Sequence, residues 1–179
     1  MLFVTFRNKL LEARDSRHRA LLRALTVRTP AVLSLALNIP GQGKTPPGSA
    51  ELFCWGRDRL ERSFSGLVEF QGGEDAAGHY ALFLLGTAPL LAKVRCLALE
   101  ESRPAARLLD LDVFDRLGRP IDRALLGLSQ RTCLACSRPA KECIRTGSHD
   151  QPALQRRIDD LLAPFRPGKA VRRPDRGAA

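Results

Sequence analysis

Residues 107–115 read RLLDLDVFD, a run in which leucine and valine alternate with acidic side chains. Because successive side chains of an extended chain point to opposite faces, a strand here presents one apolar face. That face consists of Leu109, Leu111 and Val113. Asp110 and Asp112 share the other face, where two like charges cost stability unless a cation, a donor or water compensates. The pattern predicts a strand over 108–114 whose acidic face is either solvated or a metal site.

Other segments of the chain indicate an alternation of helices and short strands around this strand. Strands are expected over 31–39, 68–70, 79–85 and 93–100, helices over 9–25, 50–62 and about 152–162, and loops or turns over 41–49, at Gly72-Gly73 and over 117–119. Helices at both ends with strands between them are typical of an α+β (mixed α/β) protein. We therefore expect a single domain with a mixed sheet flanked by N- and C-terminal helices, compatible with a nucleotidyltransferase-like fold.

The size and charge of the chain limit the number of domains and the kind of partner. At 179 residues the protein is long enough for one domain with a real core. We expect that domain over 1–165 and a basic flexible tail over 166–179, which holds five basic residues and one acidic residue. A net charge of +10 suits an anionic partner, which could be nucleic acid, a polyphosphate ligand or an acidic protein.

The apolar runs and the cysteines indicate where the protein works. No run approaches the roughly 18 apolar residues of a membrane span, and the N-terminus MLFVTFRNK lacks the features of a signal peptide. Five cysteines are an odd number, and three of them fall between 133 and 143. This distribution favours a reducing cytoplasm over a disulfide framework.

A glycine-rich loop at 41–45 (GQGKT) partly matches a phosphate-binding P-loop. The full pattern requires glycine at 38, where Asn38 stands, and Pro46 and Pro47 interrupt the helix that should follow. The loop still offers backbone N–H groups and the Lys44 cation to a phosphate. The alternative is an ordinary exposed lysine on a loop.

A third acid, Glu100, precedes the Asp-x-Asp pair and ends the run 93–100. If the two strands are neighbours, three carboxylates converge at one end of the sheet. Mg²⁺ is held by one or two protein carboxylates together with substrate phosphates, and it offsets charge during phosphoryl or nucleotidyl transfer. The alternative is a solvated strand face without a ligand.

A cluster of cysteines and one histidine has metal-ligand spacing: Cys133-x₂-Cys136-x₆-Cys143-x₅-His149. Three thiols and an imidazole suit a tetrahedral structural zinc site. A redox CxxC is disfavoured, since it should follow a strand and open a helix. The alternative is a set of small buried residues beside an unrelated histidine, and we expect Cys54 and Cys96 in the core.

With one Trp, one Tyr and no groove-binding motif, nucleic-acid binding is only a fallback interpretation.

Taken in order, these motifs resemble the apo-citrate lyase phosphoribosyl-dephospho-CoA transferases (CitX type, also called holo-citrate lyase acyl-carrier-protein synthases) over about 10–162. The resemblance rests on LEARD at 11–15 with Arg17, LNIPG at 37–41 with Lys44, Glu100, RLLDLDV at 107–113, RTCLAC at 131–136, Cys143 and His149. The family usually has His-Pro-Leu-Gly-Arg before the acids, whereas residues 103–107 read Arg-Pro-Ala-Ala-Arg. The basic tail is also additional.

The resemblance implies an activity, a metal and two partners. Such enzymes join 2′-(5″-triphosphoribosyl)-3′-dephospho-CoA to a serine of the acyl-carrier subunit of citrate lyase and release diphosphate. Asp110 and Asp112 would then be catalytic and hold Mg²⁺, with Glu100 as a third ligand or as the base. The substrate contacts implied are Lys44, Arg107, Arg14 and Arg17. Two alternatives remain open: a related enzyme for another carrier, such as that of malonate decarboxylase, and a basic zinc module that binds nucleic acid.

Overall fold

The structure is a computed structural model that describes residues 2–167, so residues 168–179 of the expected basic tail lie outside the described part of the chain. The helices are α1 (Leu2–Leu25), α2 (Ser49–Ser63), α3 (Pro89–Glu101), α4 (Ala140–Thr146) and α5 (Gln151–Leu162). The strands are β1 (Ala31–Leu37), β2 (Val68–Asp75), β3 (Gly78–Leu85), β4 (Leu109–Asp115) and β5 (Pro120–Ile121). Three short 3₁₀ turns complete the elements: η1 (Pro104–Leu108), η2 (Ala124–Leu126) and η3 (Ala163–Phe165).

The strands form one five-stranded sheet in the order β2-β3-β1-β4-β5. Every hydrogen-bonded pair in it is antiparallel, so the α+β single domain is confirmed but the sheet is not mixed. The physical reason lies in the connection through α3. It joins β3 to β4, which run in the same direction, but β1 is inserted between them and is antiparallel to both. No parallel pair therefore forms among the described strands.

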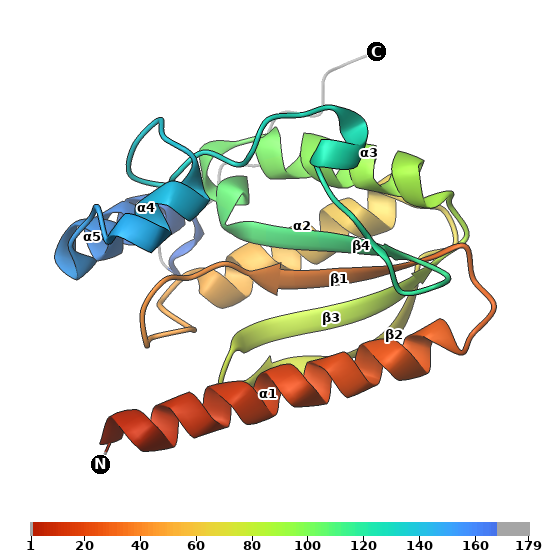
Figure 1. Ribbon diagram of the computed structural model, residues 1–179, viewed down its shortest axis with the longest axis horizontal. Coiled ribbons are helices and arrows are strands. Elements are labelled where there is room, and N and C mark those ends of the chain that lie inside the picture. Colours follow the sequence, from red (N-terminus) through yellow and green to blue (C-terminus); the bar gives the residue numbers. More distant parts are fainter. Residues whose placement is uncertain (1, 168–179) are drawn as a thin grey trace.

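Helices cover both faces of the sheet, as Figure 1 shows. On one face, alternate residues of the central strands pack against α2 and α3 and form the main core, which includes Leu33, Leu35, Phe83 and Leu111. On the other face, α1 crosses β1, β2 and β3 with small buried side chains: Ala13, Ala20 and Ala24. Small residues let a helix approach a sheet closely. Because α1 lies over the β2 side, the outer face of β4 stays open at Asp112, which is exposed.

The expected strand over 93–100 is wrong, because these residues belong to helix α3. Pro89 stands in the first turn of this helix, where its fixed φ and missing N–H are tolerated. The buried positions of α3 recur with helical spacing: Ala92, Lys93, Cys96, Leu97, Leu99 and Glu100. A short apolar run is compatible with the period of a strand or of a helix, and the Leu, Ala and Glu residues of this run favour the helix.

The turn expected at Gly72-Gly73 is also misplaced. Both glycines lie inside β2, which continues to Asp75 rather than ending at Phe70. The chain reverses one step later, where the Asp75 carboxylate accepts a hydrogen bond of 2.7 Å from the Ala77 amide. Gly78 then adopts a φ of 93°, which favours glycine. Glycines have no side chain to continue the alternation that indicates a strand, so the strand predicted from the sequence ended too early.

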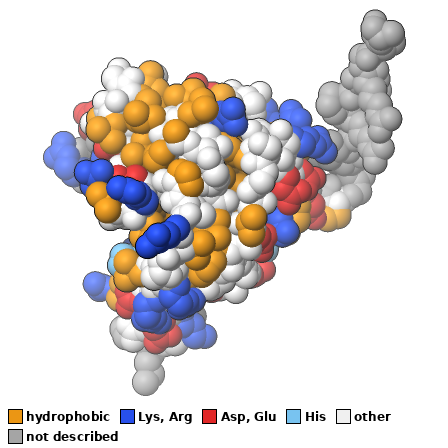
Figure 2. Space-filling view, turned by 90° about the vertical axis from the view of Figure 1, so that its right-hand side faces the viewer, with side chains coloured by type: hydrophobic (Ala, Val, Ile, Leu, Met, Phe, Trp, Pro, Cys, Tyr) orange, Lys and Arg blue, Asp and Glu red, His pale blue; other side chains and the backbone are white. Residues whose placement is uncertain are grey.

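The surface carries charges of both signs and some apolar side chains. Figure 2 shows basic side chains at separate places on one face, with acidic and apolar ones between them. Exposed apolar residues on α3 are Leu90, Leu91 and Val94. Among the described helices, none is long and apolar enough to cross a membrane.

Candidate active site and metal centre

Asp110 and Asp112 lie on the same face of β4, as their spacing predicts. Asp110 pairs with Ala36 of β1, and Asp112 pairs with Ser34. Both β1 residues have small side chains, so neither one covers the neighbouring carboxylate. Asp112 is exposed, and 45% of the Asp110 side chain is accessible. The two acids therefore form an open carboxylate pair, not a buried one.

The two acids interact with one another and with nearby cations. Partial burial raises the pKa of Asp110, and the negative charge of Asp112 raises it further. The positive charges of Arg131 and Lys93 act in the opposite direction without cancelling the effect. A bound divalent cation would remove this repulsion. The donor set of two open carboxylates suits Mg²⁺, which keeps several waters and shares its shell with substrate phosphates.

Arg131 is a site residue that sequence reasoning missed. Its Nη1 lies 3.6 Å from the Asp110 carboxylate. Its Nη2 donates to the main-chain carbonyl of Leu109 at 2.8 Å and to that of Arg107. The guanidinium therefore holds the first acid and the start of β4 together. Its position two residues before Cys133 in the RTCLAC run was a signal, but local pattern could not show what it contacts.

Glu100 does not join the two aspartates. It extends from α3 to the free edge of β4, where its Oε1 accepts a hydrogen bond of 3.0 Å from the Leu111 amide. Lys93 donates to the Leu111 carbonyl at 2.7 Å, so two buried side chains of α3 satisfy the amide and the carbonyl of one strand residue. Burial raises the pKa of Glu100. Within residues 2–167, no group of three carboxylates brings its oxygens together in a metal-binding cluster. The expected three-acid cluster is absent there, and a role of Glu100 as base stays a prediction.

Two of the predicted substrate contacts, Lys44 after the end of β1 and Arg14 on α1, are near enough for their charges to interact. Lys44 is half-buried, and its Nζ donates to the Ile39 carbonyl at 2.6 Å. Burial lowers the pKa of Lys44, and the positive charge of Arg14 lowers it further. Arg14 is exposed on α1. A bound anion would offset the repulsion between these two positive charges, so this corner of the protein suits a phosphate group.

Arg17 has protein partners in the structure. Its guanidinium donates to the Asp75 carboxylate at 2.9 and 2.6 Å and to the Gly78 carbonyl at 2.6 Å. It also stands 4.3 Å from the centre of the Tyr80 ring. These contacts fasten α1 to the β2–β3 hairpin, a structural role. Substrate binding by Arg17 stays a prediction.

Arg107 turns toward the segment that carries the cysteines, not toward the acids. Its Nη2 donates to the carbonyls of Thr132 and Cys133, both at 3.0 Å, and to the Thr132 hydroxyl at 2.8 Å. Arg131 donates in return to the Arg107 carbonyl. The two arginines therefore join the start of β4 to the segment 131–133 by reciprocal hydrogen bonds.

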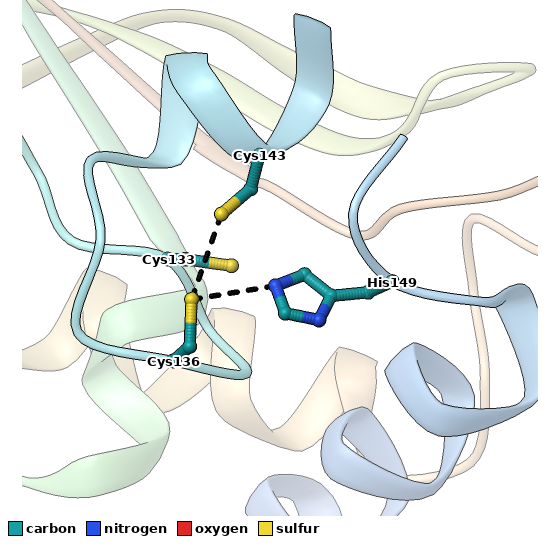
Figure 3. Close-up of side chains that lie close together, drawn as sticks. All are labelled: Cys133, Cys136, Cys143 and His149. Atoms are coloured by element: carbon teal, nitrogen blue, oxygen red, sulfur yellow. Dashed lines mark hydrogen bonds between the residues drawn. The ribbon is translucent and has the colours of Figure 1, made fainter. Parts of the chain in front are cut away.

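The Cys/His cluster is assembled from three segments, as Figure 3 shows: the loop before α4, α4 itself and the loop before α5. The ligand atoms of Cys133, Cys136, Cys143 and His149 all lie within 4.8 Å of one another. The Cys136 Sγ is 3.5 Å from the Cys143 Sγ and 3.4 Å from the His149 Nε2. Ligand sulfurs of a tetrahedral zinc with bonds of about 2.3 Å lie about 3.8 Å apart. The four residues can hold a metal ion of this kind.

The thiols of the chain differ in environment. A hydrogen bond from the Arg138 backbone is the main factor that lowers the pKa of Cys136 to about 6, whereas burial raises that of Cys143 to about 11. Cys96 is buried in the core, as expected, and burial raises its pKa to about 12. Cys54 is exposed on α2, so its predicted core position is wrong. It falls on the side of the helix away from the buried Leu52, Phe53, Gly56 and Leu60.

Comparison with known proteins identifies the family. The family model described as "Apo-citrate lyase phosphoribosyl-dephospho-CoA transferase" (CitX) matches residues 6–165. The chain belongs to this transferase family. A Streptococcus pyogenes serotype M3 protein named "Probable apo-citrate lyase phosphoribosyl-dephospho-CoA transferase" is 32% identical over 162 residues, which cover 87% of this chain and 84% of that protein. A Vibrio cholerae protein of the same name is 29% identical over 139 residues, covering 73% and 76%.

A longer kind of relative matches in part. "Protein CitXG" of Haemophilus influenzae is 44% identical over 84 residues, which are 47% of this chain and 18% of that protein. The Leuconostoc mesenteroides "Protein CitXG" is 31% identical over 147 residues, covering 80% of this chain and 32% of its own length. This member of the CitX family therefore spans a minor part of the CitXG proteins.

In this CitX family member, a cavity of about 380 Å³ connects the regions described above. It is lined on one side by Asn38, Ile39, Pro40 and Lys44, and on the other by residues of the cysteine segment, including Cys133, Cys143 and His149. Arg107 and Arg131 also line it. Asp110 and Asp112 are outside the lining but adjoin it through Arg131. The predicted loop lysine and the Cys/His cluster therefore border one cavity.

Proposed function

We propose that this chain transfers 2′-(5″-triphosphoribosyl)-3′-dephospho-CoA to a serine of the apo acyl-carrier subunit of citrate lyase. The serine oxygen forms a bond to the innermost phosphorus of the triphosphate, and the bond from that phosphorus to the diphosphate breaks. The serine proton goes to a base, and a phosphodiester and free diphosphate result. The observation that carries the proposal is the open Asp110–Asp112 pair, in a CitX family chain, with the Arg131 guanidinium beside it.

Asp110 and Asp112 are the residues that would hold Mg²⁺. The ion would supply positive charge to the diphosphate as it departs. The fold positions both carboxylates before a metal binds: Arg131 holds Asp110 at the start of β4, and the pleat of the strand keeps Asp112 on the same face. Two carboxylates that repel each other have more to gain from a cation than two independent ones.

The positive corner formed by Lys44 and Arg14 would bind the triphosphate. The bond from Lys44 to the Ile39 carbonyl fixes the position of the ammonium group before any substrate arrives. Preorganised charge of this kind stabilises a charged transition state without a reorganisation cost during the reaction. Arg14 remains exposed and can follow the substrate.

We infer that the Cys/His cluster holds a structural Zn²⁺. A closed Cys₃His set leaves no open position for a substrate, which is typical of structural zinc. The ion would join the loop before α4, α4 and the loop before α5 into one unit. Since Arg131 precedes the first ligand by two residues, the metal would also keep Arg131 in place beside Asp110.

The partners fit the charge of the protein and its site. Both the triphosphate donor and an acidic carrier protein are anionic, and the chain has a net charge of +10. On the face in Figure 2 the basic side chains do not gather into one continuous patch, which argues against a nucleic-acid groove there. We place the protein in the cytoplasm, where its five free thiols would stay reduced.

The test is to incubate the protein with the triphosphoribosyl precursor, Mg²⁺ and separate apo-carriers, and then to weigh each carrier by mass spectrometry. We expect the citrate lyase carrier to gain the phosphoribosyl-dephospho-CoA mass, and its serine-to-alanine variant to gain none. Modification of the malonate decarboxylase carrier instead would identify the alternative enzyme. A chain that modifies no carrier but shifts a nucleic acid in a salt-sensitive gel assay would support the nucleic-acid module.

A further inference from the structure

The cavity between the Lys44 loop and the cysteine segment shares Lys44 with the proposed triphosphate site, but most of its lining has no part in the phosphoryl chemistry proposed above. Its volume of about 380 Å³ lies within the usual range for small-molecule pockets, about 300–1,000 Å³. It is therefore large enough to take a part of the donor that does not react. Whatever it binds must suit both its walls and its charges.

The walls of the cavity are largely apolar. The apolar lining residues are Ile39, Pro40, Leu134, Ala140, Ile144 and Leu154. They come from the end of β1, the cysteine segment, α4 and α5, so the cavity exists only when these elements pack together. A flat aromatic group, such as a nucleobase, gains from burial between such walls.

Apart from the Cys/His cluster, the charged side chains that line the cavity are positive. Lys44, Arg107 and Arg131 line it, and no Asp or Glu is among its lining residues. An uncharged chain such as pantetheine would not use these cations. A diphosphate beside a nucleobase would use them, because arginine and lysine are the usual partners of phosphate oxygens.

The position of the cavity suits the rest of the donor. Arg131 both lines the cavity and lies 3.6 Å from the Asp110 carboxylate, and Lys44 lines it close to Arg14. A triphosphate bound at the acids would therefore lie next to this cavity, and so would the ribose that carries it. In the donor, that ribose is attached to the adenosine of dephospho-CoA.

We propose that this cavity binds the adenosine diphosphate part of dephospho-CoA, with the base against the apolar walls and the diphosphate beside Arg107. This inference rests on the proposed function, because that function supplies the donor. Ile144 of α4 forms part of the rim and is 79% exposed, so it can be changed at little cost to folding. An aspartate there would remove apolar surface and repel a diphosphate.

The experiment measures binding of dephospho-CoA to the full-length protein by isothermal titration calorimetry. Dephospho-CoA has no triphosphate to transfer, so binding and transfer are separate observations. We expect Ile144→Asp to weaken binding by about tenfold or more, which corresponds to about 1.4 kcal/mol. The control is Leu125→Asp, which adds the same charge at a 62% exposed residue outside the cavity and should change binding less than about twofold.

Two further ligands test which part of the molecule is bound. ADP should bind with the same sensitivity to Ile144→Asp, and pantetheine should not bind. Equal binding of dephospho-CoA by both variants, or binding of pantetheine without ADP, would overturn the inference. Thermal melting of both variants checks that each is folded. A protein that binds dephospho-CoA in this way but modifies no carrier would refute the proposed function alone.

Discussion

Replacing Asp110 with asparagine tests whether this acid serves catalysis or stability. Burial and Asp112 raise the pKa of Asp110, so ionisation disfavours the folded state. This cost is absent below the unfolded carboxyl pKa of about 4, and it reaches its full value once the pH exceeds the raised folded pKa. The neutral amide would remove the cost, but the variant would also lose the charged partner of Arg131, 3.6 Å away. Partly exposed charge pairs are each worth about 0–1 kcal/mol, so the opposing changes leave stability within about 1 kcal/mol of wild type.

The same change should have a large effect on transfer. A metal ion that offsets transition-state charge supplies several kcal/mol, and each 1.36 kcal/mol is a factor of about ten. We therefore expect the Asp110→Asn rate to fall by about a hundredfold or more. A stability change within about 1 kcal/mol moves the melting temperature of a protein of this size by no more than about 2–4 °C.

The assay is the initial rate of mass gain by the citrate lyase carrier, measured beside a thermal melt in the same buffer. Asp58→Asn is the matched control, because Asp58 is an exposed carboxylate on α2, on the far face of the sheet. It should leave both the rate and the melting temperature unchanged. Transfer by Asp110→Asn at the wild-type rate would refute the metal assignment. A fall of more than about 10 °C in melting temperature would show instead that the acid is structural.

Three more variants examine the surroundings of the site. Glu100→Gln keeps an acceptor for the Leu111 amide but removes a buried carboxylate whose pKa is raised in the folded protein. The stability of this variant relative to wild type should therefore increase as the pH rises above about 4, which urea unfolding at pH 4 and pH 7 measures. Arg131→Lys should lower transfer by about tenfold or more, since one ammonium cannot reproduce the fork that spans two carbonyls and a carboxylate, whereas the exposed Arg156→Lys should behave as wild type in the same rate assay. Metal analysis should find one zinc per chain, and Cys136→Ser should lose it and melt at a lower temperature, whereas Cys54→Ser should retain it; a wild-type chain without zinc would remove this site.

Local pattern predicted some parts of this protein well and other parts wrongly. The strand over 108–114 was found within one residue of β4, because the alternation of apolar and acidic side chains has a period of two. The run 93–100 has no such clear period, and it was placed in a strand although it forms α3. That error had a consequence for the site, since it put Glu100 on a neighbouring strand instead of at the free edge of β4.

By itself, the sequence determined the elements that depend on neighbours along the chain: the shared face of Asp110 and Asp112, and the ligand spacing of the Cys/His cluster. The tertiary structure alone decided which distant residues meet. It placed Arg131 beside Asp110 and turned Arg107 toward the cysteines. It also formed the cavity between β1, α4 and α5. The physical reason is that periodicity and ligand spacing are local properties, whereas these contacts depend on strand order and on how the helices pack against the sheet.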